Sequence, residues 1–459
     1  MTLANLITNQ DLFSQISPLL SMQDLGRLQR VDRGLKEWVD SVAGKILSML
    51  RDNHQTHLRC LGMWETIESF TSTINNVNLI STRLLEISGQ DKDTAVNCSK
   101  ESFDNLISAA RQQEAKNHLE LFHRIAKKFG LSLPDELLAP GREAGEAYCL
   151  DNPNALINWL DNNKISFREI KELNLFRFKG TTLPKEFLDF FPNLTHLNLG
   201  NYPQLKTLPN GLLDKCPQLK WLNLENCPQL TTLPNGFLDK CSQLEGLTLE
   251  NCPQLTALPD GFLNNCTQLN WLRLTNCPQL TALPNGFLDK CTQLTLLEIH
   301  SCPQLKTLPD GFLDKCTDLK RLIMVNCAQL KALPNRFLDN CSQLKGLRLA
   351  NCPQLTALPD GFLKDCTQLK ELYLENCPQL TALPDGFLDK CSKLEYFYLN
   401  NNRALWSDPD HTKNGEEILR RLLINKVEVN LKGSPHAERI YKNLAAKKLT
   451  SVHTIDKKR

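Results

Sequence analysis

The chain has 459 residues with 53 basic and 51 acidic side chains, so its net charge of +2 is close to balance. This length exceeds one ordinary compact core and predicts several domains or an elongated repeat array. The balanced charge gives no indication of binding to nucleic acid or to a membrane surface. The first residues, MTLANLITNQDLF, lack a basic stretch before an apolar core, and no apolar run reaches about 18 residues. Neither a secretory signal nor a membrane span is therefore predicted.

Residues 1–45 contain the stretch ISPLLSMQDLGRLQRVDRGL at 16–35, whose apolar side chains follow a helical spacing. It resembles the core of an F-box, although the customary Leu-Pro opening is missing before Asp11 and Leu35 stands where tryptophan is usual. The resemblance implies docking on a Skp-type adaptor of a cullin ubiquitin ligase, through Ile16, Leu20, Asp24, Leu25, Leu28, Val31 and Leu35. The alternative is a plain amphipathic helical hairpin in which Asp24 caps one helix.

Residues 46–168 have helical periodicity and no repeat. The stretch EAKNHLELFHRIAKKFG at 114–130 predicts a helix, and DNPNALINWLDNNK at 151–164 predicts another. We expect the second helix to cap the repeats that follow, because a terminal repeat needs a polar cover. LPDELL at 133–138 matches an F-box opening, but AGEAY at 144–148 does not continue that pattern.

Fifteen of the 18 cysteines fall into two series with a spacing of 25 residues. Seven run from Cys227 to Cys377, and eight run from Cys216 to Cys391. A fixed period of this length indicates a solenoid. The repeat therefore has to be defined before any cysteine chemistry is assigned.

Residues 169–405 contain about ten copies of this repeat. The copy LKWLNLENCPQLTTLP at 219–234 has the form L-x-x-L-x-L-x-x-C-x-x-L, which resembles the leucine-rich repeat family. The resemblance implies an α/β fold, a solenoid with a curved parallel β-sheet on its concave face, preceded here by an all-α region. The L-x-L centre alternates as a half-buried strand should. Ten such strands would form a sheet about 45 Å long.

Each cysteine of the two series replaces a residue whose side chain points into the solenoid. We therefore predict a buried ladder of thiols that donate weakly to loop carbonyls. A zinc site would need close pairs such as C-x-x-C, whereas the two cysteines of one phrase, Cys377 and Cys391, are 14 residues apart. Disulfides are disfavoured as well, because free ladder thiols indicate a reducing compartment. The sequence predicts no metal, no cofactor and a cytosolic location.

The outward positions of the strands vary while the leucines, prolines and cysteines scarcely change. These positions lie two, four and six residues after the first leucine of each repeat, and alternation places them all on the concave face. They are enriched in Trp, Tyr and Arg, which dominate binding hot spots. The predicted partner-binding residues are Trp221, Glu225, Glu250, Trp271, Arg273, Glu298, Arg321, Arg348, Tyr373, Glu375, Tyr396 and Tyr398. The alternative is neutral variation on a solvated face.

Residues 406–459 predict a capping helix, GEEILRRLLINK at 415–426, followed by a basic tail. The last 29 residues hold eight basic and two acidic side chains. A solvated tail is favoured over a nucleic-acid or import signal.

The two resemblances together imply a substrate receptor that brings a target protein to a cullin-type ubiquitin ligase, with the target on the concave face. No catalytic residue is assigned to this chain. The first alternative is a binding scaffold without a link to ubiquitin. It includes an effector of an intracellular bacterium that acts in a host cytosol, since near-identical repeats suggest recent duplication. The second is a leucine-rich-repeat ubiquitin ligase with its own cysteine, which the absence of cysteine after Cys391 disfavours.

Overall fold

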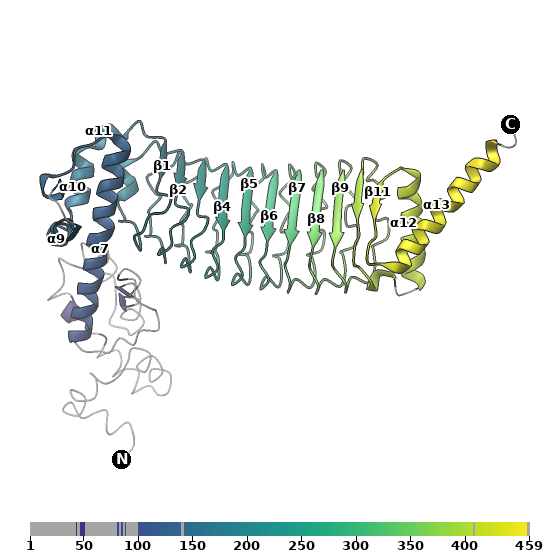
Figure 1. Cartoon of the computed structure of the whole chain (residues 1–459), viewed down its shortest axis with the longest axis horizontal. Coiled ribbons are helices and arrows are strands. Elements are labelled where there is room, and N and C mark those ends of the chain that lie inside the picture. The colour runs from purple at the N-terminus through teal and green to yellow at the C-terminus, as the bar shows by residue number, and fades with distance from the viewer. Residues whose placement is uncertain are drawn as a thin grey trace, which may run out of the picture. The chain divides into compact units, whose positions relative to one another are not determined.

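A computed structural model describes residues 43, 46–50, 80–81, 84–85, 88, 100–138, 142–406 and 409–456 (Figure 1). The chain divides into two compact units, a helical unit and a solenoid unit. The helical unit comprises residues 1–168, 178–190 and 204–212, and the solenoid unit comprises residues 169–177, 191–203 and 213–459. The residues of the predicted F-box-like motif, Ile16 to Leu35, lie outside the described residues.

The helical unit contains one long helix and several short ones. Helix α7 spans Lys100–Phe129 and is followed by α8 (Asp135–Leu138), α9 (Arg142–Asp151), α10 (Ala155–Asn162), α11 (Lys164–Phe167) and the 3₁₀ helix η2 (Phe187–Phe190). Helix α7 is followed by Gly130, whose φ of 64° suits a residue without a side chain. The helices predicted within 114–130 and 151–164 are confirmed.

The solenoid unit carries one sheet of eleven strands whose order in space is their order in the chain. The first five strands are β1 (Glu172–Asn174), β2 (His196–Asn198), β3 (Trp221–Asn223), β4 (Gly246–Glu250) and β5 (Trp271–Thr275). The next five are β6 (Leu296–His300), β7 (Arg321–Val325), β8 (Gly346–Ala350), β9 (Glu371–Glu375) and β10 (Tyr396–Tyr398), and the last is β11 (Glu428–Asn430). All neighbours pair in parallel, for example Leu247 with Leu272, so equivalent residues of successive repeats stand side by side. The predicted fold class, a solenoid with a parallel sheet, is confirmed.

The core of the solenoid is a stack of leucine and cysteine ladders. The strand leucines, such as Leu247 and Leu249, are fully buried, and so is Cys252. The Cys252 thiol donates to the carbonyl of Leu224 in the previous repeat at 3.3 Å. In the last repeat Asn402 takes the cysteine position and donates its amide N–H to the carbonyl of Leu374 at 2.6 Å. The predicted buried ladder is therefore confirmed, and its thiols donate weakly to backbone carbonyls of the previous repeat.

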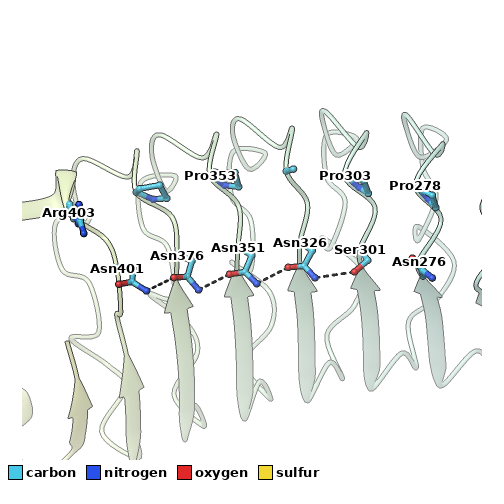
Figure 2. Close-up of a pocket in the computed structure, with 12 residues that line it drawn as sticks. Asn276, Pro278, Ser301, Pro303, Asn326, Asn351, Pro353, Asn376, Asn401 and Arg403 are labelled. Atoms are coloured by element: carbon cyan, nitrogen blue, oxygen red, sulfur yellow. Dashed lines mark hydrogen bonds between the residues drawn. The ribbon is translucent and has the colours of Figure 1, made fainter. Parts of the chain in front are cut away.

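An asparagine ladder runs along the ends of the strands. The residue after each of the strands β4 to β9 turns the backbone with positive φ, which asparagine tolerates better than most residues, as at Asn251 and Asn376 with φ of 54°. The carboxamides then bond to one another from repeat to repeat. Asn376 donates to Asn351 at 2.7 Å, and Asn401 donates to Asn376 at 2.6 Å. Figure 2 shows these amides in one row.

The C-terminal part differs from its prediction in two ways. The sheet has eleven strands rather than ten, because β11 follows the 3₁₀ helix η3 (Ala404–Trp406) and the helix α12 (Pro409–Ile424) and pairs with β10. Val427 and Leu431, which flank β11, are buried. The expected tail is instead the helix α13 (Pro435–Asp456), which begins with proline in its first turn and buries Ala437 and Leu444.

Candidate interaction face

Every second strand residue points away from the leucine core and forms what we call the open face of the sheet. All twelve predicted partner-binding residues lie on this face, Glu225 just beyond the end of β3 and the others within β3 to β10. All of them are half-buried or exposed. The in-register pairing, for example Thr248 beside Arg273, places them in columns across the sheet, as alternation predicts.

The face carries a tryptophan cluster formed by His196, Trp221, Gly246 and Trp271. The rings of Trp221 and Trp271 come from strands that are not neighbours, yet their centroids lie 5.2 Å apart. Gly246 lies between them, and a Cβ atom there would meet Trp221 at 2.4 Å. His196 stacks on the other side of Trp221 at 6.1 Å. The absence of a side chain at Gly246 therefore lets the two indoles meet.

Arg273 is held in place beside this cluster. Its Nε donates to a carboxylate oxygen of Glu298 at 2.6 Å, and its guanidinium lies 5.9 Å from the Trp271 ring centroid. The hydrogen bond to Glu298 raises the pKa of Arg273, with smaller contributions from Glu250 and Glu225. The guanidinium is thus positioned before any partner arrives.

A second group, the tyrosine cluster, lies on β8 to β10 and comprises Arg348, Tyr373, Tyr396 and Tyr398. Tyr373 and Tyr398 stack with centroids 4.9 Å apart and planes inclined by 11°. Arg348 lies 5.6 Å from the Tyr373 ring centroid, so the pair also contains a cation–π contact. Tyr396 is among the few large apolar side chains that are exposed, at 38%.

A glutamate on β11 completes the tyrosine cluster. The hydroxyl of Tyr398 donates to Glu428 at 2.9 Å, and this hydrogen bond raises the pKa of Tyr398. Glu428 was missed at the level of sequence because it lies in the unpredicted eleventh strand. His196 and Gly246 were also missed, although their columns already contained Trp221 and Trp271.

Between the clusters there are four cations: Arg321 and Arg348 within strands β7 and β8, and Lys320 and Lys345 directly before these strands. Arg321 is 3.5 Å from Glu371, while Lys320 and Lys345 take part in no ion pair with the residues that the structure describes. The same column elsewhere pairs opposite charges, as in Lys220 with Glu245 at 2.7 Å. Arg321 and Arg348 on the open face, together with Lys320 and Lys345 at its edge where the strands begin, form a cationic region next to the tyrosine cluster.

The remaining predicted residues are acidic and lie apart from the rings. Glu250 stands opposite Thr275 on the neighbouring strand, and Glu375 stands opposite Ala350. The backbone of Glu225 is held by a hydrogen bond, in which its N–H donates to the side-chain oxygen of Asn223 at 2.9 Å. Sequence reasoning grouped these residues with the aromatic ones, whereas the structure joins them only through the long-range influence of Glu225 and Glu250 on Arg273.

The cysteines of the described residues are free and buried. Burial raises the pKa of Cys149, the one described cysteine outside the ladder, to about 12. A thiol with such a pKa is a poor nucleophile. Among the described residues, no group of three or more His, Cys, Asp or Glu side chains could hold a metal ion, and no helix could span a membrane.

Comparison with known proteins supports the repeat assignment. Residues 181–320 and 281–407 match the family described as BspA type leucine rich repeat region, in six copies. No curated protein matches the sequence significantly.

Several solved structures resemble the fold. The leucine-rich repeat domain of the type III effector XCV3220 (XopL) is 21% identical, with a TM-score of 0.38, over 56% of this chain and 90% of that chain. Toll from Drosophila, in complex with Spatzle, is 24% identical, with a TM-score of 0.42, over 53% and 34%. Human 5T4 is 19% identical, with a TM-score of 0.34, over 45% and 77%. This chain thus matches about a third of the Toll chain.

Proposed function

We propose that this leucine-rich repeat protein binds another protein on the open face of its sheet. The observation that carries the proposal is the pair of aromatic clusters, each with an arginine against a ring, standing on a scaffold that otherwise repeats. Trp, Tyr and Arg at the centre of a well-packed patch are the side chains that contribute most to protein interfaces. A buried, regular scaffold gives them fixed positions.

The clusters are already ordered in the free protein. Trp221 packs against Trp271 at 5.2 Å, and Tyr373 packs against Tyr398 at 4.9 Å. Rings that keep their positions on binding lose little conformational entropy, which favours affinity. From β3 to β10 the face extends seven strand spacings, about 34 Å, which suits an interface of ordinary protein size.

The charges of the face indicate the chemistry of the partner. The cationic region includes Lys320 and Lys345, directly before β7 and β8, which form no ion pair with the described residues. A partner with carboxylates at this place would satisfy them and associate faster at low salt. We therefore expect the partner to present an acidic patch next to the tyrosine cluster.

The proposal is tested by co-purification followed by direct binding. A protein recovered with the wild-type chain should bind the variant with Trp221→Ala, Trp271→Ala and Tyr398→Ala at least 100-fold more weakly, since each hot-spot truncation costs about 2 kcal/mol. The matched control carries Lys240→Ala, Lys290→Ala and Lys390→Ala, three exposed side chains outside the strands. Equal binding of the partner to the triple aromatic variant would place the site elsewhere and reject the proposal.

A role as an F-box-type substrate receptor remains a more specific prediction from residues 16–35. It requires the chain to form a complex with a Skp-type adaptor through Leu20 and Leu25. Gel filtration of the mixture should give a complex that the variant with Leu20→Asp and Leu25→Asp does not form. If the wild-type chain gives none, the function reduces to that of a binding scaffold or effector on the same open face.

A further inference from the structure

A long groove borders the sheet on the side where the strands end, separate from the open face. It has a volume of about 690 Å³. One wall is the asparagine ladder, and the other consists of the residues two positions further along each repeat (Figure 2). The ladder wall contains Asn276, Ser301, Asn326, Asn351, Asn376 and Asn401.

The ladder wall offers a regular series of hydrogen-bond donors. A carboxamide has two N–H groups, and each bonded amide uses one of them for its neighbour. Asn351 donates to Asn326 at 2.7 Å, and Asn376 donates to Asn351 at 2.7 Å. Each asparagine of the ladder wall therefore has a second N–H that the ladder does not use, whereas the repeat with Ser301 has no such amide. Because the ladder bonds fix the amide planes, these donors are oriented in advance.

The opposite wall is apolar and the groove is almost uncharged. Its residues are Pro278, Pro303, Ala328, Pro353 and Pro378. The one charged side chain lining the groove is Arg403, at the end next to Asn401. Arg403 is exposed, and its guanidinium has no ion pair with the residues that the structure describes. A complementary ligand is therefore uncharged along its length and acidic at one end.

The spacing of the donors selects one backbone conformation. Two strand spacings amount to about 9.6 Å, and one turn of a polyproline II helix, three residues of about 3.1 Å, amounts to about 9.3 Å. An α-helix repeats at about 5.4 Å and an extended strand at about 6.8 Å for two residues, so both lose register within two or three repeats. Polyproline II also leaves all its carbonyls free to accept hydrogen bonds.

We propose that this groove binds a proline-rich segment of a protein in the polyproline II conformation, with an acidic group placed beside Arg403. Five spacings from Asn276 to Asn401 cover about 24 Å, which eight residues of polyproline II would fill at about 25 Å. The amides of alternate repeats donate to carbonyls of the ligand, and its rings pack on the proline wall. This site goes beyond the proposed binding at the open face and does not depend on it.

Fluorescence anisotropy with a named peptide tests the proposal. The probe is octaproline with a fluorescein at its N-terminus and a free C-terminal carboxylate, and the reference is an alternating Gly-Ser octapeptide labelled in the same way. We expect octaproline to bind at least tenfold more tightly, because its conformation is preformed. Amidation of its C-terminus should weaken binding to the wild type and have no effect on the Arg403→Gln variant.

A pair of ladder variants separates binding from folding. Asn326→Gly with Asn351→Gly removes two donors lining the groove, and glycine accepts the positive φ of these positions. The control, Asn201→Gly with Asn226→Gly, also places glycine at positive φ and breaks the same ladder outside the groove, where Asn251 donates to Asn226. The first pair should lose about tenfold or more in affinity for octaproline and the control pair less than twofold. Equal losses, no preference over the Gly-Ser peptide, or tighter binding of cellohexaose than of octaproline would each overturn the proposal.

Discussion

The two sides of each strand in the solenoid follow opposite rules. Towards the core, Leu272, Leu297, Leu322 and Leu347 are the same residue in four successive repeats, and all are buried. One position earlier, on the open face, the residues are Trp271, Leu296, Arg321 and Gly346. Packing in the interior allows almost no change of volume, whereas the face has no such constraint. Side chains that nevertheless pack in a defined arrangement on the face, as Trp221 and Trp271 do, therefore indicate recognition.

The largest effect should appear when residues on the two sides of one strand are each replaced by alanine. Leu297→Ala removes a fully buried side chain and should cost about 2–5 kcal/mol of unfolding free energy, because a cavity remains in a tightly stacked core. Leu296→Ala, one residue earlier and half-exposed, should cost less than about 1 kcal/mol. Urea denaturation measures both. Similar costs for the two variants would contradict the division between core and face.

Burial also changes the pKa of a histidine in the helical unit, and this makes stability depend on pH. His118 on α7 is 4% exposed, and burial lowers its pKa from 6.5 to about 4. The unfolded chain therefore takes up a proton at higher pH than the folded one, so stability is complete above pH 6.5 and decreases as the pH falls towards 4. The loss should reach about 3 kcal/mol at most. Thermal unfolding of the wild type and of His118→Gln between pH 7 and pH 4 should show that the variant lacks this part of the decrease.

Arg336 tests whether the turn after each strand-to-turn proline requires glycine at its position of positive φ. Seven equivalent positions, from Gly211 to Gly386, hold glycine with φ between 67° and 74°, whereas Arg336 has φ of 62°. An arginine in this region is strained, so Arg336→Gly should stabilise the protein by roughly 1 kcal/mol. The ion pair that is lost is long, at 3.4 Å, and joins the exposed Arg336 to the buried Asp339, which keeps Lys364 at 2.8 Å. Arg336→Ala retains the strain and should not stabilise. A gain with alanine equal to that with glycine would refute this explanation.

Most of the solenoid could be predicted because its period repeats the same information many times. The L-x-L alternation predicted which side chains face out, and the two 25-residue series of cysteines predicted the buried thiol ladder. The eleventh strand was missed because α12 interrupts the period before Val427, and β11 lacks the cysteine and the proline of the repeat. A single short strand with Glu428 and Asn430 gives no signal without its neighbour β10.

The aromatic clusters on the open face were only partly predictable, because the tryptophan cluster depends on a missing side chain. Gly246 appeared as a variable residue of no evident use, yet its missing side chain lets Trp221 reach Trp271. The groove was overlooked for the opposite reason. Its walls are mostly the repeated asparagines and prolines, with Ser301 and Ala328 as exceptions, whereas the search for function considered the residues that vary. An invariant residue of a repeat can thus form a site once stacking places its copies in a row.

The smallest expected effect concerns the lysines directly before β7 and β8. Backbone hydrogen bonds place Lys345 between Lys320 and Lys370, two like charges on neighbouring rungs. Lys345→Glu changes this repulsion to attraction and should stabilise the free protein by about 0.5 kcal/mol at low salt, an effect that 1 M salt should remove. Lys345→Gln, which only deletes the charge, should give a smaller gain. If Lys345→Glu stabilises the chain and also weakens binding of the partner at the open face, the lysine is kept for recognition at the expense of stability. If it destabilises the chain, then Lys345 makes a favourable contact in the fold, and the cationic region is no evidence for an acidic partner.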